Sequence, residues 1–110
     1  MNEFAEYLHE VFSWFGPISV RRMFGGYGLF REGLMFGLVS DDTLYLKADE
    51  ENAGRFEKLG LGQFGYRRRD RLVTLSYYMA PAEILEDSEQ AAIWARSAFE
   101  AACRSRRTKR

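Results

Sequence analysis

Apolar side chains at helical spacing mark the N-terminal part of the chain. They recur at intervals of three or four residues from Phe4 to Phe15, and most of the nearby acidic side chains lie off this stripe. The pattern predicts an amphipathic helix over residues 3–14, which Gly16-Pro17 is expected to end.

A second helix is predicted near the middle of the chain. Asp49 is a suitable N-cap for a helix that runs from Glu50 to about Leu59, and Gly60 is a suitable stop. Phe56 and Leu59 are its expected core contacts.

A third helix is predicted at the C-terminal end. Asp87 or Ser88 caps it, and Gln90 lies three residues after Asp87, as in a capping box. Small side chains on one stripe let the helix lie close to a sheet, with a tryptophan as its anchor. This inward stripe comprises Ala91, Trp94, Ala95, Ala98 and Ala102.

Six apolar runs between these helices predict strands, and the short turns between consecutive runs make neighbouring strands antiparallel. The pair Gly25-Gly26 supplies the positive φ values that a tight hairpin turn requires, and Glu32-Gly33 and Asp41-Asp42 form the next turns. The predicted strands cover residues 18–24, 27–31, 34–39 and 43–47, a run from 64–66 into 67–71, and residues 72–79.

The order helix, four strands, helix, two strands, helix predicts an α+β fold: a two-layer sandwich with an antiparallel sheet and helices on one face. One domain is expected over residues 1–103, followed by a basic tail at 104–110. The run 34–39 is apolar at both parities, which indicates burial on both faces, so we expect a homodimer through the sheet face that the helices leave open. The candidate partner contacts are Arg21, Arg22, Phe36, Tyr45 and Tyr78.

Charge is unevenly distributed along a chain whose net charge is zero. All 16 acidic residues and 11 of the 16 basic residues lie within positions 1–103, so this part carries −5 and the tail carries +5. Basic side chains near Phe64 and Tyr66 could neutralise phosphates while the aromatics stack on bases, but they could equally be solvated charges that prevent strand addition. The tail likewise could bind phosphates or be a solvated helix end. Candidate nucleic-acid contacts are Arg67, Arg68, Arg69, Arg71, Arg104, Arg106 and Arg107.

Several segments of the chain, in the same order, resemble the N-terminal domain of the TfoX/Sxy proteins, a family of bacterial competence regulators. The resemblance implies a fold of the type III secretion-chaperone class and a role as a transcriptional coactivator alongside the cyclic-AMP receptor protein. Family regulators carry a second, helical domain, so this chain is expected to be a stand-alone form. The matching segments are Arg-Arg-Met-Phe-Gly-Gly at 21–26, Gly-Leu-Phe at 28–30, Met-Phe-Gly-Leu at 35–38 and Leu-Tyr-Leu-Lys at 44–47.

No catalytic or metal-binding pattern emerges from the sequence. His9 is the only histidine and Cys103 the only cysteine, and no base neighbours that thiol in the predicted elements. We therefore expect no enzymatic activity, cofactor or metal, and a cytoplasmic protein without a membrane segment. Three functions stay open: a regulatory, protein-binding module, a direct but weak nucleic-acid binder, and a chaperone-like dimer that holds a client segment.

Overall fold

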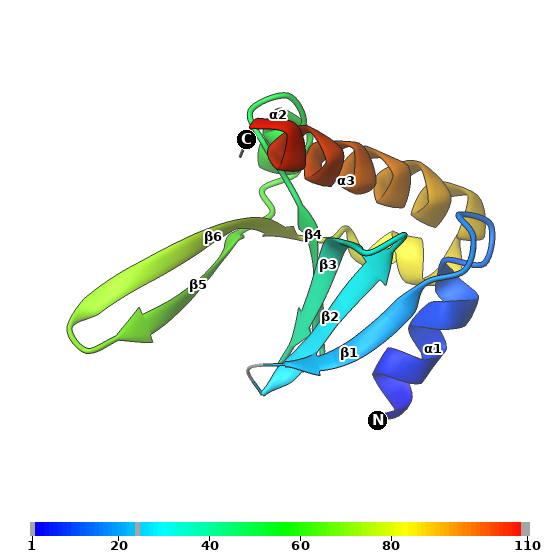
Figure 1. Cartoon of the computed structure of the whole chain (residues 1–110), viewed down its shortest axis with the longest axis horizontal. Helices are drawn as coiled ribbons and strands as arrows, with labels where there is room; N and C mark the ends of the chain where they lie inside the picture. The colour runs from blue at the N-terminus through cyan, green and yellow to red at the C-terminus, as the bar shows by residue number, and fades with distance from the viewer. Residues whose placement is uncertain (1, 24, 109–110) are drawn as a thin grey trace.

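The computed structural model describes residues 2–23 and 25–108 of the 110-residue chain. Helices and strands follow each other in the predicted order, and a short 3-10 helix is added before the last helix (Figure 1). The elements are α1 (Glu3–Val11), β1 (Ser19–Met23), β2 (Gly26–Arg31), β3 (Leu34–Ser40), β4 (Thr43–Lys47), α2 (Ala53–Lys58), β5 (Gln63–Arg68), β6 (Arg71–Met79), η1 (Ala82–Glu86) and α3 (Ser88–Thr108).

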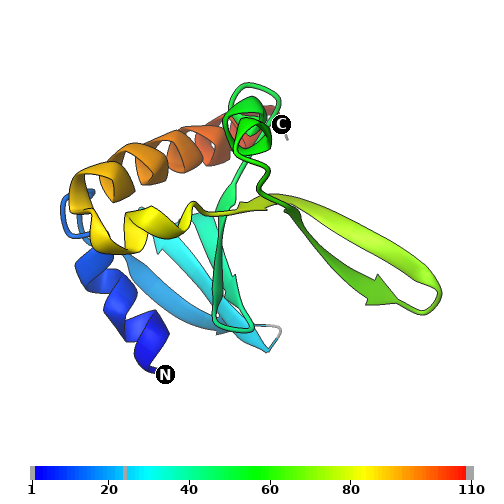
Figure 2. The ribbon, with the colours of Figure 1, turned by 180° about the vertical axis from the view of Figure 1, so that it is seen from behind.

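The strands form one antiparallel sheet in the order β1-β2-β3-β4-β6-β5. The helices α1, η1 and α3 lie over one face of the first four strands (Figures 1 and 2). The predicted α+β class and element order are therefore confirmed.

The core lies between these helices and the sheet, and an aromatic cluster forms its centre. Phe36 has no exposed surface, and its ring lies 5.7 Å from that of Phe12 and 5.2 Å from that of Phe15. The pairing of β2 with β3 shifts beside it: Leu29 pairs with Gly37, and the next residue of β2 pairs with Met35. Phe36 is thus the extra residue of a β-bulge, which turns its side chain towards the helices.

That bulge corrects one interpretation of the sequence. The run 34–39 is apolar at both parities partly because the bulge changes its alternation, so a second cover is not needed to bury Phe36. The side chain of Phe36 has no surface to offer a partner, and its predicted partner contact is wrong for this reason.

The helix α3 closes the core as the sequence predicts. Every residue of its inward stripe is at most 7% exposed. The Trp94 ring of this stripe lies 5.1 Å from the Phe56 ring. The Asp87 carboxylate accepts a hydrogen bond from the backbone N–H of Gln90 at 3.1 Å, so Asp87 caps the helix.

The helix α2 is shorter than predicted. Asp49 accepts hydrogen bonds from the backbone N–H groups of Glu51 and Asn52, and this turn precedes a helix that begins only at Ala53. Phe56 is buried as predicted, but Leu59 is 56% exposed because the helix ends before it, so its predicted core contact is wrong.

Boundaries near the N-terminus also differ from the prediction. The helix α1 ends at Val11 instead of residue 14, and turns follow it. Gly25 has a positive φ of 77°, as predicted, but Gly26 begins β2 and pairs with Met23. A side chain at Gly26 would collide with the carbonyl oxygen of Val39, so this glycine serves a close strand approach. The predicted end of the first strand, Phe24, lies outside the described residues.

The hairpin of β5 and β6 projects from the rest of the molecule (Figures 1 and 2). The strand β6 pairs with β4 only along Tyr77–Met79, and beyond this junction it pairs only with β5. We call residues 64–75 the arm and the remainder of the described chain the body. The turn at the arm's tip places Arg69 at a positive φ of 59°, which is uncommon for a side chain of this kind.

Candidate interaction surface

The arm has two different faces because side chains alternate along a strand. On one face Tyr66 pairs with Val73 and Arg68 pairs with Arg71; on the other, Arg67 pairs with Leu72. We call them the aromatic face and the back face of the arm. The aromatic face comprises Phe64, Tyr66, Arg68, Arg71, Val73 and Leu75, and the back face comprises Gly65, Arg67, Leu72 and Thr74.

The aromatic face continues onto the uncovered side of the sheet. The ring of Phe64 lies 4.9 Å from that of Tyr45 on the body and 6.3 Å from that of Tyr66 on the arm. Tyr45 pairs with Met79 on β6 and with Leu38 on β3, so these three side chains share the sheet face opposite the helices. We call the combined surface the open face. Its body residues include Arg21, Phe30, Met35, Tyr45, Lys47 and Met79.

Methionine and arginine side chains extend this surface across β1 and β2. A side chain placed at Gly28 would meet the sulfur atoms of Met23 and Met35 and the ring of Phe30, so these three groups converge over the glycine. The guanidinium of Arg21 lies 4.5 Å from the centre of the Phe30 ring, a cation–π contact.

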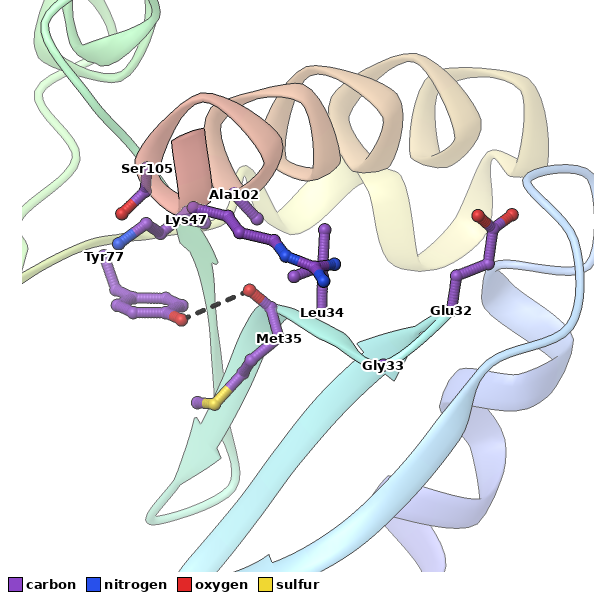
Figure 3. Close-up of a pocket in the computed structure, with 9 residues that line it drawn as sticks. Glu32, Gly33, Leu34, Met35, Lys47, Tyr77, Ala102 and Ser105 are labelled. Atoms are coloured by element: carbon purple, nitrogen blue, oxygen red, sulfur yellow. Dashed lines mark hydrogen bonds between the residues drawn. The ribbon is translucent and has the colours of Figure 1, made fainter. Parts of the chain in front are cut away.

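A pocket of about 550 Å³ lies where the open face meets the end of α3. Figure 3 shows Lys47, Tyr77 and Ser105 together on one side of it, with Leu34 between them and Glu32 on the far side. Its lining comprises Glu32, Gly33, Leu34, Met35, Lys47, Tyr77, Ala102, Ser105 and Arg106.

Tyr77 lies at the junction of the arm, the body and this pocket. Its hydroxyl donates a long hydrogen bond, 3.5 Å, to the carbonyl oxygen of Met35 (Figure 3). Burial raises the pKa of Tyr77 to about 12, so the hydroxyl stays protonated at neutral pH. Lys47 donates to the Ser76 hydroxyl at 3.0 Å, and its ammonium lies 5.2 Å from the Tyr77 ring.

The predicted partner contacts do not all lie on one surface. Arg21 and Tyr45 lie on the open face, whereas Arg22 is the next strand residue and lies on the other side of β1, exposed. Tyr78 faces α2: its ring stacks on Phe56 and its hydroxyl donates to the Glu57 carboxylate at 3.0 Å, which raises the pKa of Tyr78. Tyr78 is therefore not part of the open face, contrary to the interpretation of the sequence.

Arg104 belongs to the body instead of the exposed basic surface. Its guanidinium donates two hydrogen bonds to the Asp49 carboxylate, at 2.6 and 3.0 Å, and lies 3.2 Å from Glu51. Hydrogen bonding to Arg104 is the main reason why the pKa of Asp49 is below its usual value. Arg104 is thus engaged with acidic side chains of the body, and its predicted contact with phosphate stays a prediction.

The other predicted basic contacts are exposed but separated. Arg67, Arg68, Arg69 and Arg71 are all exposed around the tip of the arm, divided between its two faces and its turn. Arg106 lines the pocket and Arg107 is exposed, both far along the chain from the tip. Lys109 and Arg110 lie outside the described residues.

Sequence reasoning missed the pocket and the extent of the open face. Alternation in β6 separates its two faces, but it does not show that part of β6 extends beyond the helices. The overhang of α3 above Lys47 and Tyr77, which forms the pocket, has no local sequence signal.

Neither a metal cluster nor a membrane-spanning helix occurs in the part of the chain that the structure describes. Within residues 2–23 and 25–108, no three histidine, cysteine or acidic side chains gather in a way that would hold a metal ion. No helix among them is long and apolar enough to cross a membrane.

Comparison with known proteins gives consistent matches. The model of the TfoX N-terminal domain family matches residues 10–102. The DNA transformation protein TfoX1 of Aliivibrio fischeri is 36% identical over 78 residues, which are 71% of this chain and 37% of the relative. Protein Sxy of Escherichia coli K12 is 38% identical over 69 residues, 63% of this chain and 33% of the relative. The chain thus spans about a third of the length of both relatives.

Proposed function

We propose that this chain, which belongs to the TfoX N-terminal domain family, is a non-enzymatic regulatory domain that works by binding another protein. A similar protein is named for DNA transformation, and a regulatory role connected with that process is the one we propose here. The resemblance noted from the sequence supports a contribution to transcription, as a coactivator.

The observation that carries this proposal is the open face. It joins exposed apolar side chains on the arm to a sheet face that no helix covers, and Tyr66, Leu75 and Met79 are 43%, 37% and 39% exposed. Contiguous apolar surface of this kind, bordered by polar groups, is typical of interaction sites. A projecting hairpin also suits recognition better than catalysis, because catalytic groups need a surrounding shell that fixes their positions.

Each kind of partner considered for this chain is a proposal. A homodimer through the open face remains a prediction, as does a client segment held in the manner of a chaperone. For the coactivator role, the partner is expected to belong to the transcription machinery, in line with the family resemblance.

Affinity capture from the native host tests the proposal. The tagged chain, used as bait after nuclease treatment of the extract, is expected to enrich one protein above a bait destabilised by Trp94→Ala. Recovery of that protein only without nuclease treatment, or recovery of nucleic acid alone, would contradict a protein-binding role.

Direct nucleic-acid binding is the second candidate because the tip of the arm carries four exposed arginines. The rest of the chain repels phosphate. Outside residues 67–71 and 104–110, it has seven basic residues against fifteen acidic ones. We therefore expect weak duplex binding without sequence preference.

A salt titration measures this candidate. If the four arginines at the tip each contact one phosphate, the log–log salt slope on duplex DNA is about −3.6, from about 0.9 per contact. Fluorescence anisotropy at low and physiological salt provides the slope. A chain ending at Ser105 is the control for the tail, because it removes Arg106 and Arg107 but keeps the ion pair of Arg104 with Asp49. Tight, sequence-selective binding would promote nucleic acid over protein as the partner.

A further inference from the structure

We propose that the open face binds an acidic segment of a different protein, one whose carboxylates alternate with apolar side chains. This rests on the proposed protein-binding function and gives the partner's chemistry. The surface is described above, and three observations on it narrow the partner: its apolar content, the sign of its charges and the pocket at its end.

The apolar content favours a protein over a nucleic acid. Val73, Leu75 and Met79 are aliphatic or thioether side chains, which pack against apolar groups but neither stack on bases nor neutralise phosphates. Met23 and Met35 add two more adaptable side chains beside Phe30. A single strand of nucleic acid would leave these five side chains without a favourable contact.

The charges favour an acidic partner. Arg21 and Lys47 on the body and Arg68 and Arg71 on the arm are the ionisable groups of the open face other than its tyrosines, and all four are basic. Asp70 lies in the turn at the tip, on neither face. A partner with carboxylates between its apolar groups would pair with these cations as it covers the rings and methionines.

The same charges argue against a second copy of this chain. In a two-fold dimer through the open face, Arg21, Arg68 and Arg71 of both copies would gather in one interface. Gathering like charges in one interface is costly, so this surface disfavours binding of a second copy relative to binding of an acidic partner.

The pocket extends this surface by one more cation. Lys47, Met35 and Tyr77 belong to both, and Arg106 joins them from the end of α3. The lining acid, Glu32, lies on the far side of the pocket, where its carboxylate is 3.7 Å from Arg31 (Figure 3). A carboxylate of the bound segment is expected to enter between Lys47 and Arg106.

The arm offers a matched pair of variants for the test. Arg68→Glu with Leu75→Ser changes the aromatic face, and Arg67→Glu with Leu72→Ser makes the same chemical change on the back face. All four side chains are exposed, and Leu72 is the more exposed leucine at 66% against 37% for Leu75. Circular dichroism checks that both variants fold.

Three fluorescent probes then distinguish the occupants: a peptide alternating glutamate and leucine, one alternating lysine and leucine, and oligodeoxythymidine. The whole chain is expected to bind the acidic peptide, and the aromatic-face variant to weaken this binding at least about tenfold, since it reverses a paired charge. The back-face variant should stay within about twofold, as exposed charges away from an interface contribute little.

Each other outcome contradicts the proposal. The proposal fails if the whole chain does not bind the acidic peptide, or if both variants lose the same affinity for it. It also fails if the whole chain binds oligodeoxythymidine or the basic peptide more tightly than the acidic peptide. A wild-type dimer in sedimentation that the aromatic-face substitutions dissociate would assign the open face to a second copy. If affinity capture still recovers a partner equally with both variants, the proposed function stands and the assignment of this surface fails.

Discussion

The body and the arm are built from the same kind of strand and differ in what covers them. In β4, Leu44 and Leu46 are 4% and 0% exposed because α3 and η1 cover their face. In the distal part of β6, Val73 and Leu75 share one face at the same spacing, but Val73 is only half-buried and Leu75 is 37% exposed. An alternating pattern therefore specifies two faces, and the element packed against them decides whether an apolar face becomes core or contact surface.

The two regions also differ in how they hold their shape. Packing of aromatic rings in the core and of the buried alanines of α3 stabilises the body. The arm depends mainly on the ladder between its two strands, and an isolated two-stranded hairpin is at best marginally stable in water. A partner bound to the open face would supply the cover that the arm lacks.

The largest expected effect comes from breaking the body. Trp94→Ala removes a ring that is 7% exposed and packs against Phe56, so unfolding should become easier by about 3–5 kcal/mol. Leu72→Ala on the arm is the contrasting substitution and should change stability by less than about 0.5 kcal/mol. Denaturant titrations measure both, and similar losses in the two variants would mean that the arm belongs to the cooperative core.

The second prediction concerns the junction of the two regions. The pKa of Tyr77 is raised to about 12, so its protonated form stabilises the fold fully below the ordinary tyrosine range, and this contribution is lost as pH rises through 12. The loss amounts to at most about 3 kcal/mol, at about 1.4 kcal/mol per pKa unit.

Thermal melts of the wild type and Tyr77→Phe between neutral and strongly alkaline pH measure this contribution. The variant should lose less stability over the alkaline interval, because phenylalanine has no proton to release there. Parallel curves would show that the hydroxyl is not held in a low-dielectric junction.

The third prediction asks whether Arg104 belongs to the body. Arg104→Met should cost about 1–2 kcal/mol, because the Asp49 carboxylate loses two charge-assisted hydrogen bonds at a partly exposed site. Arg107→Met on the same helix is the control and should cost almost nothing, since Arg107 is exposed.

The pH dependence identifies the mechanism. The pKa of Asp49 is lowered, so the stabilisation is present above the ordinary aspartate range and is lost as pH falls below it. The difference between wild type and Arg104→Met should therefore narrow in acid. A difference that is independent of pH would assign the loss to packing of the arginine stem.

Local chemistry explains which features could be predicted from the sequence. Apolar patterns and capping residues identified the three α-helices and the six strands, and turn residues such as Asp41-Asp42, both at positive φ, located the hairpins, whereas the 3-10 helix η1 was not predicted. The bulge at Phe36, the engagement of Arg104 and the direction of Tyr78 depend on residues distant in sequence, so no local pattern contained them. The arm was predicted as a hairpin, but its projection depends on the pairing of β6 with β4 only along Tyr77–Met79, which no local pattern specifies.

The smallest expected change in stability comes from removing most of the arm, which is the sharpest test of the contrast between the two regions. Gly65 and Thr74 face each other in the ladder, so replacing residues 66–73 by Asn-Gly closes the hairpin there with a turn that suits antiparallel strands. The body should keep its melting temperature within about 4 °C, which corresponds to about 1 kcal/mol or less. Binding of the acidic peptide should be lost.

The control replaces only the turn, Arg69→Asn with Asp70→Gly, and keeps both strands of the arm. This control should bind the acidic peptide normally, because Arg69 already has a positive φ that asparagine tolerates. Cooperative unfolding that disappears with the arm would mean that the arm holds the body together, and the distinction between core and contact surface would fail.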